Sequence, residues 1–369
     1  MFAKSEQRGI DDVQLLLHVT LIVNTPSEPP TYATVPLKWV GPLAFHYQGK
    51  METCEIPLAT YESPLWPSTA RGARVSDVSG GISCTLVDQR MSRSILLETP
   101  DAGISVKLVN ELQSDMEGLQ GVVAETSRFA KLIDIHPQYV GNLVYLRFAF
   151  TTGDASGHNM ATKASQHLMA HILKRYPKLK HVSVSGNYCT DKKASAVNGI
   201  LGRGKYVVTE AIIPEKVVRR YLKTTAAKVV ELNIRKNLIG TLLAGGIRSA
   251  NAHVANILLA FYLATGQDAA NIVEGSQAIT HCENREGDLY FSLTLPNLIV
   301  GSVGNGKGLP FVEENLKRLG CREIREEGEN AGRLAVICAA AAWCGELSLM
   351  AALTNPGELM AAHEKLERS

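Results

Sequence analysis

The densest polar segment of the chain is Ser185-Gly-Asn-Tyr-Cys-Thr-Asp-Lys-Lys193, in a predicted loop between a strand and a helix. Two adjacent lysines that follow an aspartate could bind an anionic substrate. One of them could also polarise a carbonyl group, provided that a neighbouring acid keeps its ammonium group charged. The alternative is a solvent-exposed loop in which Asp191 caps the following helix. This segment alone leaves both interpretations open.

Two glycine-rich turns could face phosphate groups. Gly153-Asp-Ala-Ser-Gly-His-Asn159 lies between a predicted strand and a predicted helix, and backbone N–H groups at a helix N-terminus suit a pyrophosphate. The turn does not match Gly-x-Gly-x-x-Gly, so a Rossmann dinucleotide site is not supported. Gly304-Asn-Gly-Lys-Gly308 lacks the Gly-Lys-Ser/Thr ending of a P-loop. Each segment could also be only a turn.

Several isolated acids and histidines have both a chemical and a structural interpretation. Glu62 could be a catalytic acid or a carboxylate in the first turn of a helix. Asp268 follows a predicted buried helix, where an N-cap is the alternative to a catalytic role. His253 could be a core histidine or a ligand contact, and His363 near the C-terminus is typical of a surface residue.

A pair of histidines has the spacing of zinc ligands. His167 and His171 lie four residues apart on one predicted helix. The sequence places no glutamate beside His167 and offers no clear third ligand. A polar helix face is therefore the favoured interpretation.

The elements that would carry these residues alternate between strands and helices. Apolar spacing and turn residues predict the following segments: strands at 143–150, 181–184 and 206–213, paired strands at 289–295 and 298–303, and helices at 63–75, 158–176, 214–222, 252–265, 313–319 and 333–353. The helix at 252–265 has almost no charge and is expected to be buried on all sides. The fold class is therefore α+β or mixed α/β.

Length and composition limit the classes of function. The 369 residues predict two or three domains, and 45% apolar residues can fill a sizeable core. A net charge of +2 gives no whole-surface reason to expect binding to nucleic acid or anionic membranes. Seven cysteines without a Cys-x-x-Cys pair indicate reduced thiols and a cytoplasmic protein. The N-terminal segment does not resemble a signal peptide, and the longest apolar run, at 334–344, is shorter than the roughly 20 residues of a membrane span.

Five segments, in the same order along the chain, resemble the hydroxymethylglutaryl-CoA (HMG-CoA) reductase family. They are Ile56-Pro-Leu-Ala-Thr-Tyr-Glu62, Gly153-Asp-Ala-Ser-Gly-His-Asn-Met160, the segment from Ser185 to Lys193, Asn251-Ala-His-Val-Ala-Asn256 with the following Gly266-Gln-Asp268, and Glu346-Leu-Ser-Leu-Met350. The resemblance extends from about residue 35 to residue 363. The amino-acid sequence of the lysine segment is similar to that of the eukaryote-like class of the family.

The resemblance implies a fold with one domain inserted in another. A large substrate domain, residues 1–93 and 195–369, would surround a long central buried helix, expected at 252–265. An inserted ferredoxin-like domain at residues 95–183 would bind the nicotinamide cofactor, and residues 184–194 would connect the two. This explains why the sequence carries no Rossmann fingerprint.

The resemblance also implies four catalytic residues. Lys192 would stabilise the oxyanion that forms when hydride reaches the thioester carbonyl. Glu62 would supply a proton, and Asp268 would lie between these two residues and couple their ionisation. His363 would protonate the departing CoA thiolate from a mobile C-terminal tail.

The binding residues follow from the same resemblance. The candidates for the substrate and its CoA are Arg93, Ser185, Asp191, Lys193, Lys236, His253, Asn256, Ser68, Arg71 and Arg74. The candidates for the cofactor are Ser127, Arg128, Phe129, Asp154, Ala155, Ser156, Gly157, His158, Asn159, Val303 and Gly304. Arg128 would contact the additional phosphate that distinguishes NADPH from NADH.

The implied reaction is a four-electron reduction of HMG-CoA to mevalonate and CoA, with two NADPH and no metal. A homodimer or homotetramer is expected, with active sites at the dimer interface and without a membrane or nucleic-acid partner. Three departures from the family pattern stand out: Ser63-Pro-Leu-Trp-Pro67, His158 and Asn305. The alternatives are an enzyme that oxidises mevalonate with NAD, a non-catalytic protein that binds CoA esters, and a zinc protein based on His167 and His171.

Overall fold

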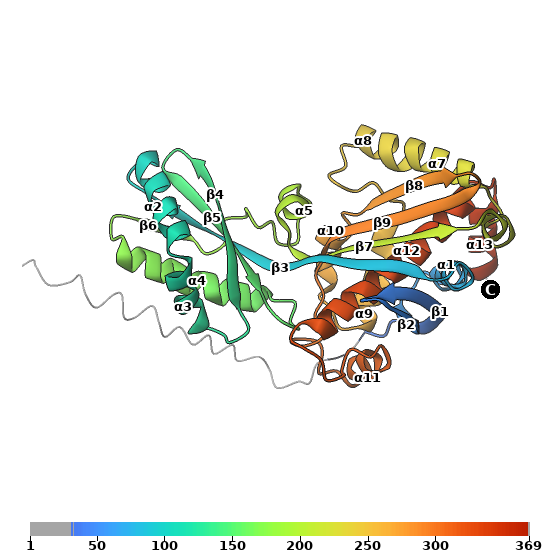
Figure 1. Cartoon of the computed structure of the whole chain (residues 1–369), viewed down its shortest axis with the longest axis horizontal. Helices are drawn as coiled ribbons and strands as arrows, with labels where there is room; N and C mark the ends of the chain where they lie inside the picture. Colours follow the sequence, from blue (N-terminus) through green and yellow to red (C-terminus); the bar gives the residue numbers. More distant parts are fainter. Residues whose placement is uncertain (1–30, 32, 368–369) are drawn as a thin grey trace, which may run out of the picture. The chain divides into compact units, whose positions relative to one another are not determined.

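The computed structural model describes Thr31 and residues 33–367. The chain divides after Thr34, and the fold described below is that of the compact unit that begins at Val35. This unit contains two antiparallel-rich sheets that share one long strand (Figure 1).

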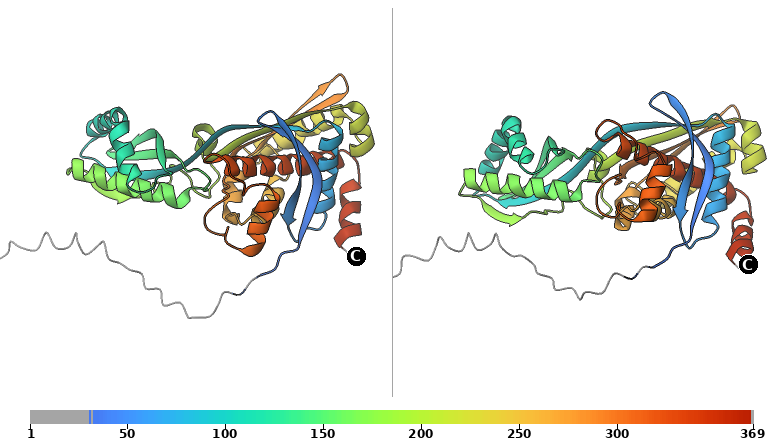
Figure 2. Two further views of the ribbon diagram at one scale, coloured as in Figure 1. Left: turned by 60° about the horizontal axis from the view of Figure 1, so that its bottom comes forward. Right: turned by 90° about the horizontal axis from the view of Figure 1, so that it is seen from below.

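The first sheet has the strand order β2-β1-β3-β7-β9-β8. Its strands are β1 (Leu37–Tyr47), β2 (Lys50–Ala59), β3 (Ile82–Glu98), β7 (Gly204–Ile213), β8 (Ile279–Arg285) and β9 (Asp288–Leu298). All neighbours are antiparallel except β1 and β3, which pair in parallel at two positions. The helices α1 (Leu65–Val78), α9 (Val254–Ala264) and α12 (Glu329–Leu353) pack with this sheet around the larger core (Figure 2).

Helix α12 is the central helix of this core. Its 25 residues are mostly alanine, leucine, cysteine and glycine, so small side chains on every side let sheet and helices approach closely. Trp343 of α12 donates from Nε1 to the carbonyl of Phe291 at 3.0 Å. Among the described residues α12 alone is long and apolar enough to span a membrane by composition, but 94% of its most apolar window is buried, which is typical of a core helix.

The sequence prediction of the central helix was wrong. The segment 252–265 forms α9, which is buried as expected but has only 11 residues. It ends at Gly266, whose φ of +63° favours glycine over other residues. The long helix lies instead at α12, where the sequence predicted a buried C-terminal helix at 333–353 but no central position.

The second sheet continues from the same strand. The C-terminal half of β3 pairs with β5 (Leu143–Thr151) and β6 (Lys180–Ser183), and β5 pairs with β4 (Lys131–Val140). Helices α2 (Ala102–Ser114), α3 (Met116–Ala124) and α4 (His158–Arg175) enclose a second core with this sheet. The buried residues of this second core lie between Met91 and Leu179, with the exception of Ile299. The inserted domain at 95–183 stays a prediction.

The remaining elements are short or peripheral. They are α5 (Val197–Leu201), α6 (Glu215–Val217), the π-helical turns η2 (Val218–Leu222) and η3 (Asn233–Gly240), α7 (Ala226–Leu232), α8 (Thr241–Leu243), the 3₁₀ turn η4 (Ala269–Asn271), α10 (Ile272–Gly275), α11 (Pro310–Arg318) and α13 (Glu358–Glu367).

The predicted pair of strands at 289–295 and 298–303 was also wrong. Strand β9 pairs with β7 and β8, and it ends at Leu298. Beyond it the chain turns toward the first glycine-rich turn, where Val303 forms an isolated bridge with Ala155. A Cβ at Gly301 would lie 2.4 Å from the backbone nitrogen of Ser156, so this close approach requires glycine.

A glycine also sets the contact between α1 and α12. A Cβ at Gly72 would lie 2.0 Å from the carbonyl oxygen of Cys344, so the two helix backbones meet directly. Backbone cannot move aside as a flexible side chain can, and the position therefore excludes any larger residue.

We expect Gly72→Ala to lower the free energy of unfolding by at least about 2 kcal/mol, because the methyl group overlaps the α12 backbone. The matched control is Gly121→Ala in α3, where an added Cβ meets nothing within 4 Å. That change should leave stability unchanged or raise it by up to about 1 kcal/mol. Urea unfolding of both variants measures the difference, and equal midpoints would contradict the proposed contact.

Candidate active site

A buried charge network holds the lysine segment. Arg203 and Glu274 are both fully buried, and Nε of Arg203 donates to Glu274 at 3.0 Å. A second nitrogen of Arg203 donates to Asp191 at 2.7 Å, and a third donates to the carbonyl of Ser92 in β3. Asp191 is therefore an ion-pair partner inside the fold, and the alternative in which it caps a helix was wrong.

The network also fixes the backbone of Lys192. Its N–H donates to Oε1 of Glu274 at 3.1 Å. Lys192 has a φ of +56° and Thr190 a φ of +40°, a left-handed conformation that is unusual for these residue types. Such strain persists only where the surrounding structure enforces it, and it concentrates at functional sites.

The side chains of Lys192 and Asp268 form an ion pair next to this network. The Nζ of Lys192 lies 2.6 Å from Oδ2 of Asp268, and both side chains are partly exposed. The other oxygen of Asp268 accepts from the N–H of Ala270, so the N-cap interpretation is confirmed, and the catalytic role stays a prediction. Asp268 is thus held in place by backbone on one side and offers its charge to Lys192 on the other.

This pairing keeps both groups charged. The hydrogen bond to Asp268 is the main cause that raises the pKa of Lys192 above its usual value. Partial burial acts to raise the pKa of Asp268, but the hydrogen bonds from Lys192 and Ala270 outweigh it, and the pKa falls below its usual value. Lys192 is therefore a stable cation at neutral pH.

A cavity of about 380 Å³ opens beside this pair, and we call it the lysine pocket. Its lining combines the lysine segment, the segment from Gln267 to Asn271 and both glycine-rich turns: Arg93, Ala155, Ser156, Gly157, His158, Asn159, Met160, Asp191, Lys192, Gln267, Asp268, Asn271, Ile299, Val303, Gly304, Asn305 and Lys307. Seven predicted cofactor residues and four predicted catalytic or substrate residues thus share one cavity.

Polar atoms in the lysine pocket lack protein partners. Among the described residues, Nε2 of His158, Nε of Arg93 and both side-chain polar atoms of Asn271 are buried without a hydrogen bond. Buried polar groups normally have partners, so these atoms fit a polar ligand that completes them. Asn271 was not a sequence prediction.

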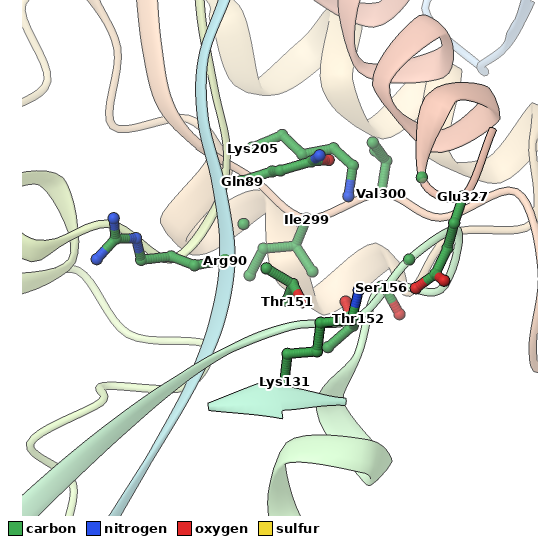
Figure 3. Close-up of a pocket in the computed structure, with 13 residues that line it drawn as sticks. Gln89, Arg90, Lys131, Thr151, Thr152, Ser156, Lys205, Ile299, Val300 and Glu327 are labelled. Atoms are coloured by element: carbon green, nitrogen blue, oxygen red, sulfur yellow. The ribbon is translucent and has the colours of Figure 1, made fainter. Parts of the chain in front are cut away.

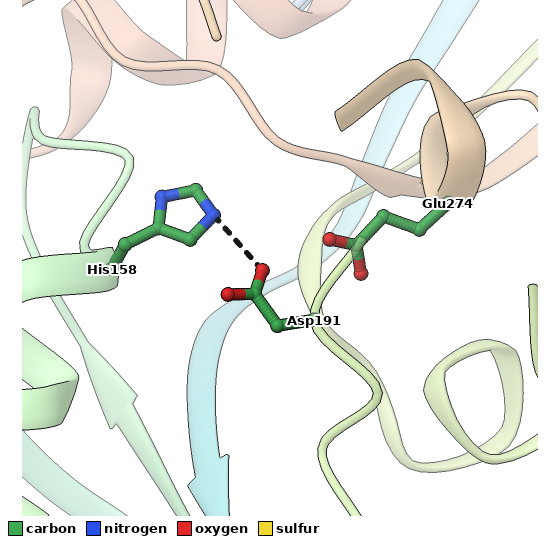
Figure 4. A group of neighbouring side chains, drawn as sticks. All are labelled: His158, Asp191 and Glu274. Carbon is green, nitrogen blue, oxygen red and sulfur yellow. Dashed lines mark ion pairs between the residues drawn. The ribbon is translucent and has the colours of Figure 1, made fainter. Parts of the chain in front are cut away.

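His158 is neutral in this pocket. Burial is the main cause that lowers its pKa to about 4, and the charge of Arg203 acts in the same direction. Its Nε2 lies 3.6 Å from Asp191, and these two residues with Glu274 have the spacing of a metal site (Figure 4). Arg203 already pairs with both carboxylates, so its guanidinium supplies the positive charge that a metal would provide.

A second cavity, of about 390 Å³, contains Glu62, and we call it the glutamate pocket. The Nδ2 of Asn256 donates to Oε2 of Glu62 at 2.9 Å. His253, Ser68 and Arg71 also line this pocket. Five predicted catalytic or substrate residues therefore meet here, but in a different cavity from Lys192.

A buried carboxylate on α12 supports residues that line the glutamate pocket. Glu346 is fully buried and accepts from the N–H groups of Ala252 and His253, at the start of α9. It also accepts from the hydroxyl of Thr280 at 3.1 Å. Because a carboxylate at a helix N-terminus satisfies free N–H groups, Glu346 fixes the position from which α9 presents His253 and Asn256.

The C-terminal helix reaches the same pocket. Arg71 forms an ion pair with Glu358 of α13 at 2.5 Å and donates to the carbonyl of Ser348 at 2.6 Å. Leu359 of α13 also lines the cavity. The predicted catalytic His363 falls in α13, and its side chain lies outside the described residues.

Other predicted site residues lie around the two pockets. Arg93 donates to Ser185 at 3.3 Å, and Lys193 donates to the carbonyl of Asp191 at 3.1 Å, so both stay with the lysine segment. Ser127 contacts the sulfur of Met160 at 3.4 Å, next to the lysine pocket. Neither pocket contains Arg74, Lys236, Arg128 or Phe129 in its lining. Arg74 pairs with Asp77, and Arg128 lies over the Phe129 ring.

The carboxylate of Asp154 forms hydrogen bonds within the protein. Its two carboxylate oxygens accept from the N–H groups of Gly328 and Ala331, at the start of α12. The carboxylate of Asp154 thus caps this helix, and the prediction that Asp154 belongs to the cofactor site stays a prediction. The cofactor turn is tied to the central helix.

Comparison with known proteins decides the family. A family model described as hydroxymethylglutaryl-coenzyme A reductase matches residues 28–368. The chain belongs to this family. The 3-hydroxy-3-methylglutaryl-coenzyme A reductase of Aeropyrum pernix is 44% identical over 336 residues, which cover 90% of this chain and 79% of that protein.

Other relatives and solved structures agree with this assignment. The reductase of Pyrococcus abyssi is 43% identical over 90% of this chain and 82% of that protein. A class II 3-hydroxy-3-methylglutaryl-CoA reductase from Streptococcus pneumoniae, solved bound to NADPH, matches with a TM-score of 0.71 and 16% identity, over 90% of this chain and 88% of that one. At this identity the structural match establishes the fold of the HMG-CoA reductase family and nothing finer.

Several residues that build the site were not sequence predictions. Arg203, Glu274 and Asn271 stand outside the quoted motifs, and Glu346 stands inside one without an assigned role. The signal available was a charged residue in an apolar context, as in Ile272-Val-Glu274 and Cys344-Gly-Glu346. Because such a residue is rarely buried without a partner, it deserves a structural assignment in any HMG-CoA reductase sequence.

We expect Asp268→Asn to lower the pKa of Lys192, because the change removes the carboxylate whose hydrogen bond raises it. Lys192 should then react as a free amine at lower pH than in the native chain. Competitive acetylation at a series of pH values, read by mass spectrometry, measures this shift. Asp268→Glu keeps a carboxylate and serves as the control, and an unchanged labelling profile in Asp268→Asn would show that Asp268 does not set the charge of Lys192.

Proposed function

We propose that this chain catalyses the NADPH-dependent reduction of HMG-CoA to mevalonate and CoA. The observation that carries the proposal is the charged Lys192, 2.6 Å from Asp268 in a pocket lined by the cofactor turn. Family membership agrees with it. A fixed cation beside a cofactor pocket is what reduction of a thioester carbonyl needs, because negative charge develops on the carbonyl oxygen.

The residues of the lysine pocket fit a nicotinamide cofactor. The unpartnered Nε2 of His158 and the amide of Asn271 offer hydrogen bonds to a polar group such as a carboxamide. The N-terminus of α4 directs backbone N–H groups at the turn, which suits a pyrophosphate. When bound there, NADPH would supply hydride, and we propose NADPH over NADH with Arg128 as the contact of its additional phosphate.

Each predicted catalytic residue has a distinct task in this proposal. Lys192 holds the oxygen of the thioester, and later of the aldehyde, through its charge. Asp268 keeps Lys192 protonated and positioned. Glu62, which Asn256 orients, donates the proton that converts the aldehyde oxygen to the alcohol. His363 protonates the CoA thiolate after the carbon–sulfur bond breaks.

We propose that the complete active site forms between two copies of the chain. Lys192 and Asp268 line one cavity, whereas Glu62, Asn256 and the CoA-facing residues line another. Reduction needs the cation and the proton donor at one carbonyl group. A symmetric dimer that joins the lysine pocket of one protomer to the glutamate pocket of its partner supplies both, and it does so twice.

A reducing, cytoplasmic location fits the thiols. All seven cysteines are free, and six of them are buried. Burial raises the pKa of the Cys54 thiol to about 12, and it raises the pKa of the Cys321 thiol likewise. Such thiols are poor nucleophiles and do not form a disulfide framework.

We expect the chain to oxidise NADPH only when HMG-CoA is present, and Lys192→Ala to lower kcat about 10²–10³-fold with the fold intact. Spectrophotometric assays and circular dichroism measure the two properties. Lys193→Ala is the matched control: its side chain binds rather than activates, so it should raise KM more than it lowers kcat. Native turnover by Lys192→Ala would remove this lysine from the mechanism.

Two inactive variants should restore activity to each other if the site crosses a dimer interface. When Glu62→Gln and Lys192→Ala chains are co-expressed, half of the dimers are mixed and each has one intact site, so we expect about one quarter of native activity. Co-expressed Lys192→Ala and Asp268→Asn chains, both altered in the lysine pocket, should show no such recovery. Absence of recovery in the first pair would contradict the composite site.

A further inference from the structure

A third cavity lies behind the cofactor turn and contains a buried lysine. It has a volume of about 210 Å³, and Lys205 is among its lining residues. Lys205 belongs to β7, in the middle of the first sheet, with Gln89 of β3 and Leu298 of β9 as its backbone neighbours. Figure 3 shows its side chain extending into the space between Gln89, Ile299 and Thr152.

The ammonium group of Lys205 has no hydrogen-bond or ion-pair partner within the described part of the chain. The residue is only 5% exposed, and its Nζ makes no hydrogen bond or ion pair with any residue that the structure describes. Burial lowers the pKa of Lys205 to about 8, with the charge of Asp154 acting in the opposite direction. Asp154 forms no ion pair with Lys205, and its two carboxylate oxygens accept from the N–H groups of Gly328 and Ala331 at the start of α12.

The cavity wall supplies further donors for an anion. The amide of Gln89 and the hydroxyl groups of Thr151 and Ser156 line it. Arg90, also in the lining, is paired with Asp88 at 2.5 Å, and the exposed Lys131 and Glu327 at the wall oppose each other in sign. Lys205 is therefore a cation of this cavity that no described residue pairs with directly, and groups that can donate hydrogen bonds line the cavity beside it.

We infer that this cavity is a binding site for a small oxyanion of the phosphate class, with Lys205 as its anchor. A buried cation without a counter-ion is costly, and an anion that fits the cavity removes that cost. The hydroxyl and amide donors can each bind a different oxygen atom of one oxyanion. Chloride is a single atom, so an oxyanion satisfies these donors better. The site is separate from the lysine pocket, which lies on the other side of the turn.

Occupation of this site should affect the cofactor turn. Ser156 and Ile299 line both the Lys205 cavity and the lysine pocket, so the turn from Gly153 to Gly157 forms a shared wall. An anion held behind this wall restrains the turn that faces the cofactor. The inference goes beyond the proposed reaction, because the anion is neither its substrate nor its product.

The test is thermal unfolding of the full chain in inorganic phosphate, against sodium chloride of equal ionic strength, at pH 7. We expect roughly 30 mM phosphate to raise the midpoint by about 2–4 °C. The increase should persist with saturating NADPH, which blocks the lysine pocket. Lys205→Met should unfold at a higher temperature than the native chain without phosphate, since it removes the buried cation, and it should show no response to phosphate.

Lys107→Met, at an exposed lysine of α2, is the matched control and should keep the full response. If Lys205→Met does not fold, Gln89→Leu replaces it and should weaken phosphate binding about 10-fold, as measured by calorimetry. A native chain that does not respond to phosphate overturns the inference. A response that survives in Lys205→Met, or that NADPH abolishes, also overturns it, because the anion then binds elsewhere.

Discussion

The structure of the site depends on the ion pair between Arg203 and Glu274. Both side chains are fully buried, and each also binds the lysine segment, Arg203 through Asp191 and Glu274 through the N–H of Lys192. Loss of either partner would leave an uncompensated charge in the core, which is far more damaging than loss of a surface pair. The same pair thus stabilises the fold and enforces the strained conformation in which Lys192 faces Asp268.

The sequence was sufficient to predict which residues of the short motif segments lie in pockets of the fold. Lys192, Asp268, Glu62 and Asn256 were all predicted, and the structure brings them together as two pairs. Local residue types indicate such positions, because a cation, an acid and an amide are the groups that the proposed reaction needs. Strands β5 and β7 and helix α4 were confirmed for a similar reason, since their apolar spacing is local.

Contacts between distant residues decided what the sequence could not predict. Arg203 and Glu274 lie 71 residues apart, and Glu346 caps a helix that begins more than ninety residues earlier. Nothing local in Glu346 or Asp154 distinguishes a buried helix cap from a ligand contact, so the sequence could not predict that both carboxylates cap helices. The central position of α12 likewise follows from its packing against α1, α9 and strands of the first sheet, not from its own periodicity.

The continuity of β3 has a mechanical consequence. Arg90 pairs with Gly204 of the first sheet, and the next residue, Met91, pairs with Phe150 of the second. The ladder partners of β3 therefore change between these two residues, and neither the ladder with β7 nor the ladder with β5 spans the junction, so the strand can bend there while both ladders stay intact (Figure 1). Arg93 lies in β3 two residues after Met91, in the part that pairs with β5. The lysine pocket, which Arg93 lines, therefore borders the junction between the two sheets, and a change in the angle between the sheets would alter its geometry.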